Sequence, residues 1–179
     1  MRRIGFGVHG TPAAGLGLVW VYSGALWLVA VWAGWTVGRG ELALLAFIRA
    51  MATVGIGVAV CGTERWGWAV AVTLGAIYAV FGAGVAALVG TALAQRPPGS
   101  LSWQPVLWGL TSAQCIPLLQ VAGVVTLAGL LTVVSLWRAR AHFDVPVGKL
   151  YGTLVSFGVV PALLVLLVDG FLLLGWARP

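Results

Sequence analysis

Residues 42–60 read LALLAFIRAMATVGIGVAV, and this apolar stretch decides the fold class of the chain. A helix needs about 20 residues to cross the hydrocarbon core of a membrane, and this stretch has nearly that length. A single charge, Arg49, interrupts it, and the neighbouring charges along the chain are Glu41 and Glu64. On insertion scales a guanidinium at membrane depth costs about 2.5–3.5 kcal/mol unless it meets a partner or water. The stretch therefore predicts a transmembrane helix whose arginine needs a partner.

The composition of the whole chain agrees with this prediction. Of its 179 residues, 61% are hydrophobic and 8% are charged, and the mean hydropathy is +1.05. A soluble domain of this length could not bury so much apolar surface. We therefore expect an all-α integral membrane protein.

Apolar stretches separated by charged and turn-forming residues predict about five transmembrane helices. The expected spans are residues 14–37, 42–61, 66–94, 112–137 and 150–176. Together they would form a bundle in a single polytopic membrane domain that covers residues 1–179. The third span, at about 1.5 Å per residue, would be about 43 Å long and should tilt or project from the membrane.

The fourth span is the least regular of the five. Gln104, Pro105 and Pro117 interrupt its apolar character, which leaves four or five spans open around residues 103–120. Five spans are favoured, with residues 103–110 as an interfacial lead-in and the crossing beginning near Ser112.

The basic residues predict an orientation for the five-span arrangement. Counted on alternate sides, six lysines and arginines lie with the N-terminus and three lie on the other side. The positive-inside rule then places the N-terminus in the cytoplasm and the C-terminus outside. The compact chain favours the inner (plasma) membrane of a prokaryote as its location.

Ten tryptophans provide a second indication of depth. Nine of them lie near predicted span ends, where indole rings favour the headgroup level, and Trp27 alone falls in the middle of a span. Anchoring and packing is the favoured interpretation of the whole set.

Asp169 is the second charge inside a predicted span. Arg49 and Asp169 each lie about seven residues from the outer ends of their spans, which places both about 10 Å below that surface. We therefore predict a buried ion pair that joins the second and fifth helices, with Glu41 as an alternative acid for Arg49.

This polar site has two interpretations. In the first, the ion pair only sets the register and orientation of the helices. In the second, Arg49 faces a water-filled pocket for an anionic or polar substrate, with Gln114 and Gln120 of the fourth helix as polar lining. Pro161, eight residues before Asp169, would open the fifth helix by freeing a backbone carbonyl.

Small residues indicate where helices approach closely. The predicted third helix carries two stripes with the spacing of helix contacts. They are Gly75, Ala79, Ala83 and Ala87 in one, and Gly82, Ala86 and Gly90 in the other. Two stripes predict a central helix that touches two neighbours, or one neighbour and a partner chain.

Known catalytic and cofactor patterns are not found in the sequence. The chain has four acidic residues and two histidines, which do not supply the clusters that intramembrane proteolysis or headgroup transfer needs. His9, His142 and Asp144 could at most form a metal site, and the interpretation as solvated loop residues is favoured. The two cysteines, Cys61 and Cys115, fall near opposite ends of their spans and should be free thiols.

We therefore expect a non-enzymatic accessory or structural subunit of a membrane assembly. No catalytic residue, cofactor or metal is predicted, and an enzyme is less favoured than a non-enzyme. The expected partners are the lipid bilayer and other membrane subunits that contact the Gly/Ala faces. Nucleic acid is excluded because the chain has no block of basic residues. The alternative is a small carrier or channel with a polar site around Arg49 and Asp169.

Overall fold

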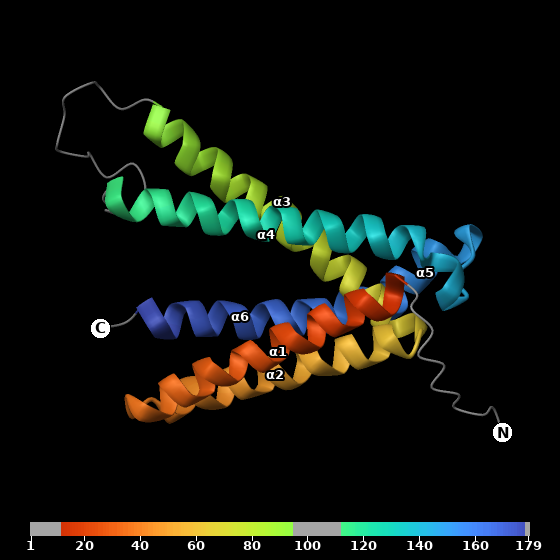
Figure 1. Ribbon diagram of the computed structural model, residues 1–179, viewed down its shortest axis with the longest axis horizontal. Helices are drawn as coiled ribbons and strands as arrows, with labels where there is room; N and C mark the ends of the chain where they lie inside the picture. The colour runs from red at the N-terminus through yellow and green to blue at the C-terminus, as the bar shows by residue number, and fades with distance from the viewer. Residues whose placement is uncertain (1–11, 95–111, 178–179) are drawn as a thin grey trace. The chain divides into compact units, whose positions relative to one another are not determined.

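A computed structural model describes residues 12–94 and 112–177, which form helices and turns without a strand. The long helices are α1 (Pro12–Thr36), α2 (Gly40–Cys61), α3 (Arg65–Ala94) and α4 (Ser112–Arg138) (Figure 1). The last span consists of α5 (Leu150–Thr153), a π-helical segment η3 (Leu154–Val159) and α6 (Val160–Ala177). Within the described residues, five segments are long and apolar enough to cross a membrane. The all-α prediction is confirmed, and the chain has the architecture of a multi-pass membrane protein.

The helices end where the turn-forming residues predicted breaks. Gly38 adopts a φ of 75°, and its N–H donates to the carbonyl of Trp35 at 3.1 Å, which ends α1. Between α2 and α3 the chain turns at Thr63, whose φ is 57°. The 30 residues of α3 correspond to about 45 Å, so this helix is longer than the hydrocarbon core, as expected. The predicted lead-in at residues 103–110 lies outside the described residues.

The chain divides into two compact units. One comprises Met1–Thr73 with Val134–Pro179, and the other comprises Leu74–Val133. Each unit is described by itself below. The prediction that residues 1–179 form one membrane domain stays a prediction.

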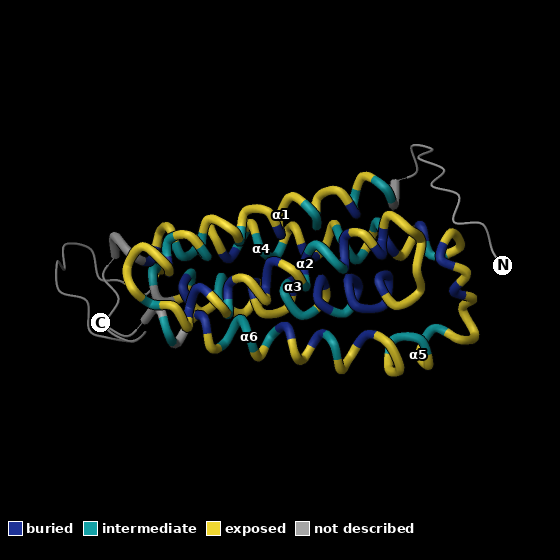
Figure 2. The backbone as a smooth tube through the Cα atoms, turned by 90° about the horizontal axis from the view of Figure 1, so that it is seen from below, coloured by how far each residue is buried: buried dark blue, intermediate teal, exposed yellow. Residues whose placement is uncertain are grey.

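In the first unit, α1 and α2 form a close antiparallel pair (Figure 1). A Cβ at Gly57 would lie 2.7 Å from the carbonyl oxygen of Gly17, and a Cβ at Gly17 would lie 2.7 Å from that of Gly57. Backbones can approach this closely only where side chains are missing. Buried positions concentrate along α2 and the beginning of α3, whereas much of α1 is exposed (Figure 2).

In the second unit, α3 packs on α4 through both predicted stripes. A Cβ at Gly129 of α4 would lie 2.8 Å from the backbone nitrogen of Ala79, and one at Gly82 would lie 2.8 Å from the carbonyl oxygen of Ala122. Ala79 and Gly82 belong to different stripes, so residues of both stripes contact the same helix, α4. Ala83 and Ala87 are exposed.

Substituting alanine for Gly129 should lower the free energy of unfolding by about 1–2 kcal/mol, because the added methyl group meets the backbone of α3. Gly123→Ala is the matched control, since a Cβ at Gly123 has nothing within 4 Å and alanine favours the helix. Thermal unfolding of both variants in detergent measures the difference. Equal stability of the two variants would contradict this close contact.

The last span is irregular immediately before Pro161. The π-helical segment η3 ends at Val159, and Gly158 within it lies against α3, where a Cβ would come within 2.9 Å of the carbonyl oxygen of Ala69. Proline has no N–H to donate to the preceding turn and crowds that turn, which explains the wider helix there. The fifth span is thus irregular directly before Pro161, and the freeing of a backbone carbonyl there stays a prediction.

Trp68 joins the beginning of α3 to the end of α4. Its ring is fully buried, and its indole N–H donates to the carbonyl of Leu136 at 2.8 Å. Leu136 lies in the last turn of α4, where carbonyl oxygens lack partners within the helix. Trp68 thus packs inside the protein.

Trp68→Phe should lower the free energy of unfolding by about 2 kcal/mol, because it leaves the Leu136 carbonyl without this donor and creates a small void. Trp66→Phe is the control, since Trp66 is 42% exposed in the same helical turn. Chemical unfolding in mixed micelles would compare the two variants. The proposed role of the Trp68 hydrogen bond would be wrong if both substitutions had the same small effect.

Candidate functional site

Arg49 lies on the buried face of α2. This face also carries Leu42, Ala46 and Thr53, which lie seven, three and four residues from Arg49, as one side of an α-helix requires. The Arg49 side chain is 6% exposed. A charged group so deeply enclosed is stable only with partners that replace water.

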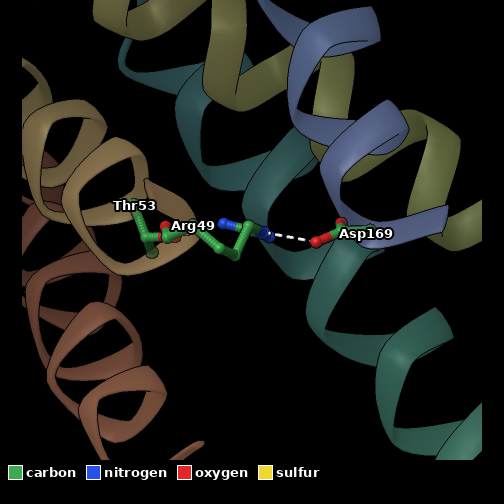
Figure 3. A network of polar contacts seen from close by, with 3 residues as sticks. All are labelled: Arg49, Thr53 and Asp169. Carbon is green, nitrogen blue, oxygen red and sulfur yellow. Dashed lines mark hydrogen bonds and ion pairs between the residues drawn. The ribbon is translucent and has the colours of Figure 1, made fainter. Parts of the chain in front are cut away.

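Asp169 of α6 supplies the first partner. The Nε of Arg49 donates to the Oδ1 of Asp169 at 2.6 Å, and the Asp169 side chain is 18% exposed (Figure 3). Opposite charges and a short hydrogen bond make this a charge-assisted contact, the strongest class of side-chain hydrogen bond. The predicted contact between Arg49 and Asp169 is thus present, and it joins α2 to α6.

Thr53 supplies the second partner, one helical turn after Arg49. The Nη1 of Arg49 donates to the Thr53 Oγ1, and the Thr53 hydroxyl donates to the Arg49 carbonyl at 2.8 Å. Thr53 is 1% exposed, so its hydroxyl has little access to solvent. A hydroxyl can accept and donate at once, which lets one small side chain serve both groups.

Trp27 of α1 supplies the third partner. The Cζ of Arg49 lies 5.4 Å from the centroid of the Trp27 ring, within cation–π range. Arg49, Thr53, Asp169 and Trp27 together form what we call the polar cluster. It connects α1, α2 and α6, all within the first compact unit.

The sequence predicted the charged pair of this cluster and missed its two neutral members. Trp27 had one usable signal, because it is the tryptophan that falls in the middle of a span. Thr53 had another, because a hydroxyl four residues from an intramembrane arginine shares its helix face. Neither signal indicates by itself that the two side chains meet the guanidinium.

The other predicted site residues lie in α2 and α4. Glu41 lies in the first turn of α2 and is exposed, and Asp169 is the acid that contacts Arg49. Gln120 is exposed on α4, in the second compact unit. The side chain of Gln114 lies outside the described residues. A role for Gln114 and Gln120 in a polar lining stays a prediction.

The polar cluster compensates its own charge. A guanidinium and a carboxylate face each other, and a hydroxyl and an aromatic ring also contact the cation. Groups arranged in this way can hold three helices in a defined register.

No protein-family model, no curated protein and no solved structure matches this chain.

A second polar contact joins α6 to the beginning of α2. The Nη1 of Arg39, just before α2, donates to the carbonyl of Gly175 at 2.9 Å, in the last turn of α6. Cations near a helix C-terminus satisfy free carbonyls and interact favourably with the helix dipole. The contact reinforces the link between α2 and α6 that the polar cluster makes.

Within residues 12–94 and 112–177, no three or more His, Cys, Asp or Glu side chains gather where they could hold a metal ion. His142 is exposed, and His9 lies outside the described residues. Cys61 and Cys115 are free thiols, as predicted.

Proposed function

We propose that the chain is a non-enzymatic accessory or structural subunit of a membrane assembly. In this role the polar cluster holds α1, α2 and α6 in register. The observation that carries the proposal is the contact between Arg49 and Asp169 with the arginine 6% exposed. A guanidinium bound to a carboxylate, a hydroxyl and an indole ring of its own chain is already neutralised and enclosed.

A substrate site at Arg49 would have to break these contacts. An anionic ligand would displace Asp169 and leave its carboxylate in apolar surroundings, which costs several kcal/mol unless water enters. The structural role needs no such exchange, and it is therefore favoured.

Small-residue faces support the assembly part of the proposal. On α3, Ala83 and Ala87 are exposed, and a Cβ at Gly84 or Gly90 would have nothing within 4 Å. Without a hydrophobic driving force inside lipid, helices associate through surfaces of this kind, where backbones can approach closely. Another membrane subunit is the partner that such a face suits.

The orientation belongs to the proposal as well. The distribution of basic residues favours a cytoplasmic N-terminus, an external C-terminus and the inner (plasma) membrane. Reporter fusions at the two termini test this: a fluorescent protein that folds only in the cytoplasm should work at the N-terminus and fail at the C-terminus.

A small carrier or channel is the second candidate, and one observation favours it. The π-helical segment η3 precedes Pro161 in the span that carries Asp169. Such wide turns occur often at functional sites, where a helix has to bend or expose a carbonyl. In this case Asp169 would act as a counter-charge that a substrate displaces.

Cysteine accessibility distinguishes the two functions. In a variant without Cys61 and Cys115, single cysteines would be introduced at Ala50, beside the polar cluster, and at Glu41, at the exposed helix end. A membrane-impermeant thiol reagent should label position 41 and leave position 50 unmodified if the cluster is closed. Labelling at position 50 from one side of the membrane would favour the carrier. A cysteine at Gln120 would test in the same way whether α4 faces a water-filled space.

A further inference from the structure

The connection between α4 and the last span is an ordered structure. It contains two short 3-10 helices, η1 (Arg140–Phe143) and η2 (Val147–Lys149). Phe143 is fully buried and Val145 is 3% exposed, so two apolar side chains anchor the connection to the protein. Asp144 between them has a φ of 56°, a left-handed conformation that aspartate tolerates, and the chain reverses there.

This connection borders an open surface cavity of about 420 Å³. Arg138, Arg140 and Asp144 line it, together with apolar residues such as Val145 and Val147. The volume lies within the range of small-ligand sites, about 300–1,000 Å³. Two guanidinium groups beside one such space favour an anionic group.

The charges around the cavity remain positive after the internal contacts are counted. Asp144 forms an exposed ion pair with Arg65 at the beginning of α3, so its negative charge is compensated. Arg140 donates to the carbonyl of Trp137 at a long 3.3 Å, and its Cζ lies 5.6 Å from the centroid of the Trp137 ring. Arg138 forms no hydrogen bond or ion pair within the described part of the chain. Most guanidinium N–H groups of Arg138 and Arg140 are therefore available to a ligand.

The cavity lies where a membrane protein meets lipid headgroups. The fourth span ends at Arg138 and the fifth begins at Val147, so the residues that line the cavity connect the ends of two spans. Aromatic residues lie in the adjoining helix ends, with Trp137 of α4 41% exposed and Tyr151 of α5 80% exposed. Exposed aromatic residues at helix ends are typical of the headgroup level.

We propose that this cavity binds the phosphodiester group of an anionic phospholipid. The guanidinium groups of Arg138 and Arg140 donate to the phosphate oxygens, and Trp137 positions Arg140 by stacking on it. Arginine suits this task because its planar fork of donors matches two phosphate oxygens at once. A zwitterionic lipid binds less well, because its own cation would lie near the two arginines. The site is an open cavity with a specific set of lining residues, which differs from the general attraction of basic loops to a charged leaflet.

Native mass spectrometry of the full chain in a mild detergent tests the proposal. The protein would be offered an equal excess of phosphatidylglycerol or phosphatidylcholine. We expect a dominant complex with one phosphatidylglycerol and several-fold less phosphatidylcholine. Arg138→Gln and Arg140→Gln should each weaken the phosphatidylglycerol complex about fivefold, as expected for one basic residue near an anionic headgroup.

Lys149→Gln is the matched control. It removes one positive charge from the same connection, but Lys149 does not line the cavity. Phosphatidylglycerol binding should therefore change little. Equal losses for Lys149→Gln and the two arginine variants would overturn the proposal, because the attraction would then come from diffuse charge.

Further measurements complete the test. Glycerophosphoglycerol, the soluble phosphodiester that remains when phosphatidylglycerol loses its acyl chains, should not displace the lipid at equal concentration, and displacement would show that a soluble phosphodiester is the ligand. Arg138 and Arg140 are not buried, so their glutamine variants should unfold at the temperature of the unchanged chain. Arg138→Lys and Arg140→Lys, which keep the charge, should retain more lipid than the glutamine variants do. Equal binding of the two lipids by the unchanged chain would also contradict the proposal.

Discussion

Replacing Asp169 with leucine should lower the free energy of unfolding by about 3–5 kcal/mol, the cost typical of removing one partner from a buried ion pair. The substitution leaves the Arg49 guanidinium without its carboxylate, while the arginine side chain is 6% exposed. Thr53 and Trp27 do not carry a negative charge that could replace it. Unfolding in mixed micelles and the amount of protein inserted in membranes measure the effect.

Replacing Arg49 with leucine should lower the free energy of unfolding by less. In Arg49→Leu the carboxylate of Asp169 remains, and its side chain is 18% exposed against 6% for Arg49, so the charge that is left is less enclosed. The double variant with leucine at both positions should regain much of the lost stability, since it leaves no buried charge. Asp169→Leu therefore gives the largest loss of the three variants.

Exchange of the two charges provides the complementary test. Arg49→Asp combined with Asp169→Arg keeps one charge of each sign in the pair, and it should restore part of the expression that either single substitution loses. Complete recovery is not expected, because Thr53 and Trp27 surround position 49 and not position 169. Failure of both double variants to exceed the single variants would contradict the role of the pair.

Gly57→Leu should be the second large effect, with a loss of about 3 kcal/mol, near the upper end of what overpacking usually costs. A Cβ at Gly57 would lie 2.7 Å from the carbonyl oxygen of Gly17 and 2.8 Å from the backbone nitrogen of Val21. Backbone atoms cannot move aside as a flexible side chain can. We expect α1 and α2 to separate, which would also move Trp27 away from Arg49.

Gly55→Leu on the same helix is the control for this variant. A Cβ at Gly55 would have nothing within 4 Å, and leucine has a higher helix propensity than glycine. Its stability should equal or exceed that of the unchanged chain. The proposed close packing of α1 on α2 would be wrong if both leucine variants unfolded alike, and tryptophan fluorescence during thermal unfolding would show this.

The number and extent of the helices could be predicted because they depend on local properties. A span must be apolar over about 20 residues, and the breaks at Gly38–Glu41 and at Gly62–Arg65 contain the glycines and charges that end helices. The observed bounds of α2, Gly40–Cys61, therefore lie within two residues of the predicted span 42–61. The regular rise of a helix then gave Arg49 and Asp169 a common depth.

Predictions about neighbours were less successful, because small residues occur on several faces of the same helix. Both stripes of α3 were expected to indicate separate contacts, yet Ala79 and Gly82 both lie against α4. Two helices that cross at an angle bring residues of adjacent ridges into one contact, and spacing along one sequence does not record that angle. The sequence also did not indicate that Trp68 would turn its indole N–H to the end of α4.

The amino-acid sequence by itself determined that this protein consists of helices long and apolar enough to cross a membrane and that two opposite charges lie inside two of them. Only the tertiary structure decided what surrounds those charges. Depth is one coordinate along the helix axis, whereas a contact also requires the rotation of each helix and its place beside the others. Those quantities brought Trp27 and Thr53 to Arg49, and they made the arginine part of a polar cluster that joins three helices.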